Sequence, residues 1–177
     1  TFEKHLGFLD SIHRQLKVKG SLSPGQQEWL NSLCLRYSEE QLQEGKKWSA
    51  EYSDQMKINA ERVAQYYLNN PPYFGVLAKR TMSGYNLSKS EYSKMCNNKY
   101  AQKILAEYKK EPRFAEGSMV QFRKTDRRSG QHAVVLSTEG RPIIKAVKGA
   151  REYKLLPVGS MTPIYSMEKN LKRAKRA

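Results

Sequence analysis

Basic side chains gather in the last third of the sequence, where they could bind the phosphate oxygens of a nucleic acid. Residues 115–177 hold 14 lysines and arginines against 5 acidic residues, a net charge of +9, whereas residues 1–114 hold 18 against 12, a net charge of +6. Cations on one surface bind phosphate and release condensed counterions, which gives affinity without sequence choice. The predicted contacts are Arg123, Lys124, Arg127, Arg128, Arg141, Lys145, Lys148, Arg151, Lys154, Lys169, Lys172, Arg173, Lys175 and Arg176, with base stacking added by Tyr153 and Tyr165.

Acidic side chains in the same region could instead hold a divalent cation. Asp126, Glu139 and the triplet Glu152-Tyr153-Lys154 resemble the D…E-x-K arrangement of metal-dependent nucleases, in which carboxylates hold Mg²⁺ and the lysine helps to activate the attacking water. The alternative is a set of exposed surface charges, because E-x-K arises by chance in any charged sequence. The three histidines are scattered, and the sequence has no Gly-rich phosphate loop or nucleophile elbow. We therefore expect no catalytic residues, no metal site and no cofactor, with a nuclease as a remote alternative.

Short β-type segments, each ended by a turn signal, follow one another in this basic region. Five strands are predicted, at Ser118–Lys124, His132–Thr138, Pro142–Lys148, Tyr153–Val158 and Thr162–Met167. In the first of them Val120 and Phe122 alternate with more polar residues, so one face can enter a core. Five strands with tight connections over about fifty residues favour a small, partly open barrel.

The opening phrase of this region has a counterpart in a known family of small barrels. Gly117-Ser118-Met119-Val120-Gln121-Phe122-Arg123, followed by a basic turn and a Val/Leu strand, resembles SH3-like barrels of the KOW/Tudor type. The resemblance covers about a third of the chain. It implies binding of RNA, DNA or a polymerase, and the alternative is a barrel that only packs against its neighbours.

The first 112 residues are predicted to be helical. Apolar residues recur at three- and four-residue steps down to Gly20, and Ser23-Pro24 signals the start of a second helix that runs to about Arg36. Further helices are predicted from Ser38, with a break at Gly45, and over Ser49–Leu68, Tyr73–Met82 and Ser88–Lys110. The tail at Asn170–Arg176 could form a short basic helix. We therefore predict an α+β protein with a helical domain at residues 1–112 and an SH3-like barrel with a basic tail at residues 113–177.

Tyrosine is abundant in the helical part, with more rings than one core would need. These tyrosines are Tyr37, Tyr52, Tyr66, Tyr67, Tyr73, Tyr85, Tyr92, Tyr100 and Tyr108. Exposed tyrosine beside lysine or arginine suits a protein interface or a nucleic-acid surface. An alternative function is therefore an adaptor that docks on a polymerase, replication or packaging complex.

Composition sets the broad class and the expected compartment. The net charge of +15 favours polyanionic partners, and we expect nucleic acid, DNA ahead of RNA, and no membrane partner. Cys34 and Cys96 have no cysteine or histidine at metal-ligand spacing, which fits a reducing cytoplasm. No apolar stretch approaches the roughly 20 residues of a membrane span. The small size and basic character also resemble accessory proteins of bacteriophages, so the expected location is the cytoplasm, nucleoid-associated or in the host cytoplasm if the protein is viral.

Overall fold

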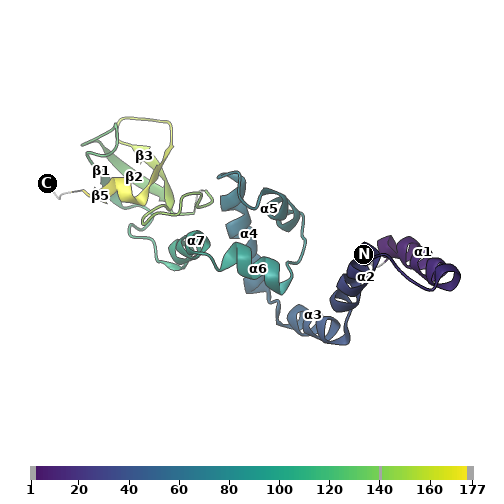
Figure 1. Ribbon diagram of the computed structural model, residues 1–177. Coiled ribbons are helices and arrows are strands. Elements are labelled where there is room, and N and C mark those ends of the chain that lie inside the picture. The colour runs from purple at the N-terminus through teal and green to yellow at the C-terminus, as the bar shows by residue number, and fades with distance from the viewer. Residues whose placement is uncertain (1–2, 140, 175–177) are drawn as a thin grey trace. The chain divides into compact units, whose positions relative to one another are not determined.

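The computed structural model describes residues 3–139 and 141–174 and has the α+β class that the sequence predicts. Within these residues seven α-helices precede a five-stranded antiparallel sheet (Figure 1). The helices are α1 (Glu3–Lys19), α2 (Pro24–Arg36), α3 (Glu39–Glu51), α4 (Asp54–Leu68), α5 (Gly75–Met82), α6 (Lys89–Cys96) and α7 (Lys99–Lys109). The strands are β1 (Met119–Phe122), β2 (His132–Ser137), β3 (Glu152–Pro157), β4 (Ile164–Met167) and β5 (Leu171–Arg173), with the 3₁₀-helix η1 (Glu168–Asn170) between β4 and β5.

The chain divides into two compact units, one that ends at Glu51 and one that begins at Tyr52. The first unit contains α1, α2 and α3. The second contains α4 to α7 together with the whole sheet. The change from helices to strands, where the sequence places a domain boundary at residues 112/113, therefore lies inside the second unit.

In the first unit, α1 and α2 each bury one apolar side chain and are joined by polar side chains. Ile12 of α1 and Leu33 of α2 are buried. The side-chain amides of Gln15 and Gln26 exchange hydrogen bonds of 3.0 and 2.8 Å. The predicted start of α2 is confirmed, because Ser23 and Gln26 form a capping box that satisfies two backbone N–H groups at the helix end.

Three helix boundaries differ from the prediction. Helix α3 runs through Gly45 without a break, since a glycine inside a helix costs only about 1 kcal/mol relative to alanine. The predicted helix Ser49–Leu68 is interrupted before α4, where the Ser53 hydroxyl accepts the N–H of Met56 and starts a new helix. The predicted helix Ser88–Lys110 is divided in the same way, because Asn98 caps α7 through its side-chain oxygen.

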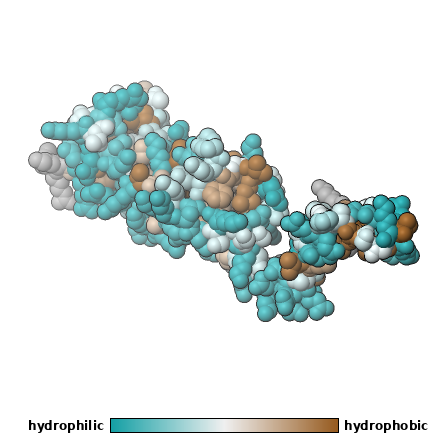
Figure 2. Space-filling model, viewed as in Figure 1, coloured by the Kyte–Doolittle hydropathy of each residue, from teal (hydrophilic) through white to brown (hydrophobic). Residues whose placement is uncertain are grey.

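Helix α4 is the centre of the helical part of the second unit. The core cluster there consists of Ala60, Val63, Ala64, Tyr67, Ala78, Leu87, Met95, Cys96, Ala101 and Leu105, contributed by α4, α5, α6, α7 and the α5–α6 connection. Small side chains on α4 allow the neighbouring helices to approach closely. Apolar residues also gather on the surface over α5, where Val76 is 77% exposed (Figure 2).

The sheet has the strand order β4-β3-β2-β1-β5, with every neighbouring pair antiparallel. All five strands contribute to one core on a single face, as the alternation of side chains in strands requires. That core contains Phe114, Val120, Phe122, Ala133, Val135, Tyr153, Leu155 and Leu171, with Ile164 packed against it. Strands β4 and β5 are the two edges, so the sheet is open and not a closed barrel.

Two of the predicted segments in this region are wrong. Pro142–Lys148 is not a strand; its Ile143 is buried against α7, in a cluster with Ile104 and Ala150. Its Ile143 N–H donates to the Tyr108 hydroxyl at 2.8 Å instead of to a neighbouring strand. Within the predicted helix Asn170–Arg176, residues Leu171–Arg173 form the strand β5 instead, because Leu171 fills the sheet core and pairs with Phe122 of β1.

A buried carboxylate joins α7 to the segment between β2 and β3. Glu107 is 5% exposed, and its Oε2 accepts the N–H of Gly149 at 2.8 Å while its Oε1 pairs with Lys110. The guanidinium of Arg151 donates to the carbonyl oxygens of Glu107 and Lys110 at 3.2 and 2.6 Å. These bonds hold the end of α7 against the sheet region of the same unit.

Candidate nucleic-acid interface

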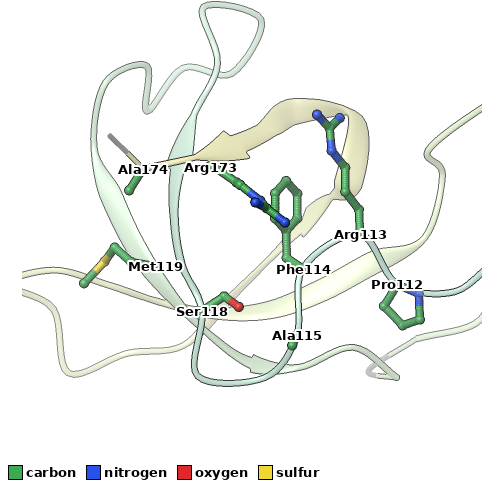
Figure 3. Close-up of a pocket in the computed structure, with 8 residues that line it drawn as sticks. All are labelled: Pro112, Arg113, Phe114, Ala115, Ser118, Met119, Arg173 and Ala174. Carbon is green, nitrogen blue, oxygen red and sulfur yellow. The ribbon is translucent and has the colours of Figure 1, made fainter. Parts of the chain in front are cut away.

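A groove lined by two arginines lies at the β1–β5 edge of the sheet. It has a volume of about 650 Å³ and is formed by the chain before β1, the start of β1 and the end of β5 (Figure 3). Its lining residues are Pro112, Arg113, Phe114, Ala115, Ser118, Met119, Arg173 and Ala174. We call it the arginine groove. Arg113 and Arg173 are both exposed, although they lie at opposite ends of the sheet region in the sequence.

A hydrogen-bond network behind the groove positions Arg113. The Glu168 carboxylate accepts the Arg113 backbone N–H at 3.2 Å and the Tyr153 hydroxyl at 2.7 Å. The Phe114 N–H donates to that hydroxyl at 3.4 Å, and the Arg113 guanidinium lies 5.4 Å from the Phe114 ring centre. Burial and the bond to Glu168 raise the pKa of Tyr153 to about 12, so the phenol stays protonated at neutral pH. Because these bonds use the backbone of Arg113, its side chain is not held by them.

Strand β5 presents its two cations to opposite sides of the sheet edge. Arg173 is paired with Val120 of β1, and Lys172 with Gln121. Successive side chains of a strand point to opposite faces, so Arg173 lies on the core side, where the groove is, and Lys172 lies on the outer side. Both side chains are exposed. A backbone of phosphates that follows this edge could meet a cation on either side.

The turn after β1 adds exposed cations next to the start of β5. The Arg123 Nε donates to the Leu171 carbonyl at 2.7 Å, which ties the turn to β5. Asp126 is held inside the turn, since it accepts the Arg128 N–H at 2.9 Å and the Ser166 hydroxyl at 3.4 Å. Lys124 and Arg127 of the same turn are exposed. The local carboxylate is therefore engaged, and the exposed charged side chains of the turn are basic.

Other predicted contact residues have structural partners. Arg151 bonds to the end of α7, and Lys154 is half-buried opposite Tyr165. The Arg141 guanidinium lies 3.9 Å from the Tyr165 ring centre and 3.9 Å from the Glu152 carboxylate. One face of the Tyr165 ring is therefore covered. Three further predicted contacts, Lys145, Lys148 and Lys169, are exposed.

The predicted stacking role of Tyr153 is wrong. Its ring is fully buried in the sheet core and lies 6.0 Å from the Phe114 ring, so no base can reach it. The presence of a tyrosine among basic residues does not reveal this burial. Tyr153 occupies an inward position of β3. The predicted contacts Lys175 and Arg176 lie outside the described residues.

The carboxylates of the nuclease alternative do not form a cluster. Asp126 is bound by Arg128 and Ser166, and Glu152 lies beside Arg141. Over residues 3–139 and 141–174 no three histidine, cysteine, aspartate or glutamate side chains are grouped in a way that could hold a metal ion.

Arg113 and Phe114 are site residues that the sequence did not single out. Their region reads as a boundary after Glu111-Pro112, and only the pairing of β1 with β5 brings Arg173 next to them. The one local signal is a cation directly followed by an aromatic residue.

Comparison of the chain with protein-family models, with curated proteins and with solved structures found no match. In the described part of the chain, none of the helices has both the length and the apolar character needed to cross a bilayer.

Proposed function

We propose that the protein binds nucleic acid without catalysing a reaction, with DNA ahead of RNA as the ligand. The observation that supports this most directly is the meeting of Arg113 and Arg173 in one groove, with Lys172 exposed on the other side of β5. Arginine suits phosphate because its planar guanidinium donates two parallel hydrogen bonds. Contacts of this kind give affinity that does not depend on base sequence.

The charge balance around the groove favours a polyanion. The net charge of the chain is +15, and of the carboxylates near the groove Glu116 and Glu168 already accept hydrogen bonds from protein groups. Their negative charge is partly compensated by these bonds, whereas the arginines of the groove remain exposed. The local field at the β1–β5 edge should therefore attract phosphate.

An SH3-like sheet of the KOW/Tudor type is part of this proposal. The order with β1 between β2 and β5, and a single core shared by five short antiparallel strands, support that family, as does the opening phrase at Gly117–Arg123. The free thiols Cys34 and Cys96 support the reducing cytoplasm as the compartment.

The test is a salt titration by fluorescence anisotropy, with labelled duplex DNA, single-stranded DNA and RNA of one sequence. If five to eight phosphates are neutralised on the duplex, the slope of log affinity against log salt should be about −4.5 to −7. Arg113→Ala and Arg173→Ala should each make this slope shallower by about one unit. Lys17→Ala, an exposed cation of α1, is the matched control and should leave the slope unchanged.

A flat salt response, or no binding at low salt, would contradict the proposal and favour the protein-binding adaptor. One observation supports that alternative: apolar side chains are exposed over α5, including Val76 and Met82 at 77% and 46%. Exposed apolar residues of this kind can mark a protein interface.

A further inference from the structure

Five aromatic rings surround a second pocket in the second unit, in its helical part. The pocket has a volume of about 440 Å³, which is within the range of about 300–1,000 Å³ that is typical of small-ligand sites. Its rings are those of Tyr66, Tyr67, Tyr73, Phe74 and Tyr100, and Lys94 also lines it. We call it the aromatic pocket. The abundance of tyrosine in this part of the sequence is thus explained in part by one site.

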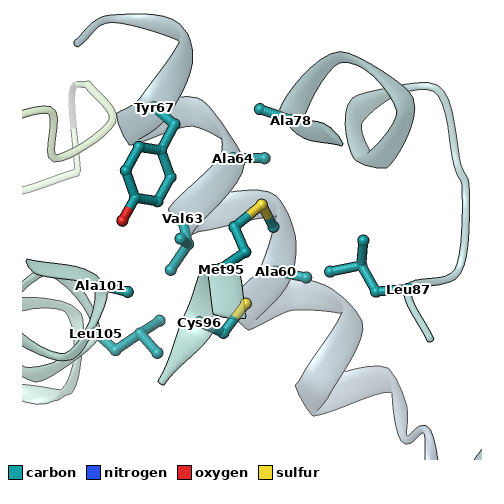
Figure 4. Close-up of a cluster of buried hydrophobic side chains, with 10 residues drawn as sticks. All are labelled: Ala60, Val63, Ala64, Tyr67, Ala78, Leu87, Met95, Cys96, Ala101 and Leu105. Carbon is teal, nitrogen blue, oxygen red and sulfur yellow. The ribbon is translucent and has the colours of Figure 1, made fainter. Parts of the chain in front are cut away.

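Packed rings form the inner part of the pocket. Tyr67 lies at the end of the helical core that Figure 4 shows, and its hydroxyl donates to the Asn98 side-chain oxygen at 3.0 Å. Its ring centre is 5.0 Å from that of Tyr66 and 4.8 Å from that of Phe74. Burial raises the pKa of both Tyr66 and Tyr67, so these phenols remain neutral. The inner rings are therefore fixed in place before a ligand arrives.

The backbone at Phe74 is strained in the conformation that brings its ring to the pocket. Its φ is 55°, in the left-handed region that is unfavourable for a residue with a side chain. Packing of the Phe74 ring against Tyr67 offsets this cost.

The outer rings are open to solvent. Tyr73 is 70% exposed and Tyr100 is 47% exposed, although both line the pocket. The Lys99 ammonium group is 5.1 Å from the Tyr100 ring centre, and Lys94 is exposed at the same site. The pocket therefore offers aromatic faces next to positive charge.

The chain around the pocket is strongly basic. Residues 66–103 contain six basic residues and one acidic residue, which gives a net charge of +5. The acidic residue, Glu91, lies 3.6 Å from the Arg80 guanidinium and accepts the Ser88 N–H at 2.9 Å. A ligand that complements this site carries a flat apolar face and negative charge.

We infer that the aromatic pocket takes an unpaired base of a single-stranded nucleic acid, with its phosphates on Lys94 and Lys99. This inference rests on the proposed function and gives it a strand preference. Bases stack on aromatic side chains regardless of sequence. Only an unpaired base can turn out of the base stack and place its face on a protein ring. An uncharged or basic apolar peptide could contact the same rings but would gain nothing from the net positive charge.

The experiment uses a single-stranded oligonucleotide that carries 2-aminopurine, whose fluorescence is quenched when the base stacks. The oligonucleotide is titrated into the full chain and into Tyr100→Ala, Tyr73→Ala and Tyr100→Phe. Tyr85→Ala is the matched control, because Tyr85 is also an exposed tyrosine beneath a cation, with Arg80 at 3.8 Å, but it does not line the pocket. The exposure of both Tyr73 and Tyr100 makes loss of folding a poor explanation for any effect, and circular dichroism checks this.

We expect quenching with the wild type, and about tenfold weaker binding with less quenching in Tyr100→Ala and Tyr73→Ala. Tyr100→Phe and Tyr85→Ala should behave like the wild type. The affinity for duplex DNA should change less than twofold in Tyr100→Ala, whereas Arg113→Ala should weaken it. A failure of the aromatic-pocket inference can therefore be distinguished from a failure of the proposed function at the arginine groove. Wild-type affinity of Tyr100→Ala for the single strand, or a bright 2-aminopurine in the wild-type complex, would overturn the inference and leave the pocket to a peptide.

Discussion

Glu107→Ala should destabilise the second unit by removing the carboxylate that joins α7 to the sheet region. Oε2 of Glu107 accepts the N–H of Gly149, a residue that is itself buried. Without the carboxylate that N–H has lost its acceptor in a place that water does not reach. The ion pair with Lys110 is lost as well, but the Lys110 side chain is 51% exposed.

The size of the effect follows from these two contacts. A hydrogen bond to a charged group contributes about 1.5–3 kcal/mol, and an ion pair with an exposed partner contributes at most about 1 kcal/mol. Glu107→Ala should therefore lower the free energy of unfolding by about 2–4 kcal/mol. Glu107→Gln keeps an oxygen that can accept the Gly149 N–H and should lose about 1 kcal/mol. Glu111→Ala removes an exposed carboxylate just beyond α7 and is the control.

The distribution of chromophores allows each unit to be followed by itself in urea. Both tryptophans, Trp29 and Trp48, belong to the first unit, and ten of the eleven tyrosines belong to the second. The free energy of unfolding falls by about 1–3 kcal/mol per molar urea. The midpoint of the tyrosine transition in near-ultraviolet circular dichroism should therefore shift to lower urea by about 1–2 M in Glu107→Ala. Tryptophan fluorescence should not shift. Equal midpoints for Glu107→Ala and Glu111→Ala would refute the reasoning, as would a shift confined to the tryptophans.

Three further outcomes are expected. The pKa of Tyr153 is raised from 10.0 to about 12, so its neutral phenol stabilises the fold below pH 10, and about 2–3 kcal/mol of this is lost as the pH rises to 12. Other buried groups such as Cys96 also lose stability in this range, so urea unfolding should show a smaller loss in Tyr153→Phe than in the wild type, by that amount. Cys34 is exposed, whereas burial raises the pKa of the Cys96 thiol to about 12, so a thiol reagent should modify one cysteine in the native protein and two after unfolding. Gly149→Ala should destabilise the protein by about 2 kcal/mol or more, because φ is +69° and a Cβ would lie 3.1 Å from the backbone of η1. Gly159→Ala has a φ of +81° but open space around the new Cβ, so it should cost about 1 kcal/mol. Thermal unfolding of the two variants compares these costs.

Features that depend on neighbouring residues could be predicted from the sequence. The helix starts predicted at Ser23 and Ser88 are both confirmed, and each has a capping box, whose bonding groups are only three residues apart. The strands β1, β2, β3 and β4 lie within the predicted segments or within one residue of them. Their alternation of inward and outward side chains is a local property of the chain.

Features that depend on distant partners could not be predicted in the same way. The run around Ile143 is as apolar as a buried strand, but α7 supplies its burial and Tyr108 its hydrogen bond. Leu171 lies in a basic run that reads as a helix or tail, and it becomes a strand because β1 has a free edge to pair with. For the same reason the sequence predicts a basic surface but not the groove, in which Arg113 and Arg173 meet only through that pairing.

The position of β5 also bears on how copies of the protein behave toward one another. An edge strand has unpaired N–H and C=O groups along its outer side, and these can pair with the edge of another molecule. Lys172 and Arg173 place two like charges on a strand of three residues, so two such edges repel each other when they approach. This protection is electrostatic and is screened by salt, with a Debye length that falls to about 3 Å at 1 M. The cations that suit the edge for phosphate thus also discourage aggregation of the free protein, and a bound polyanion or high salt removes that safeguard.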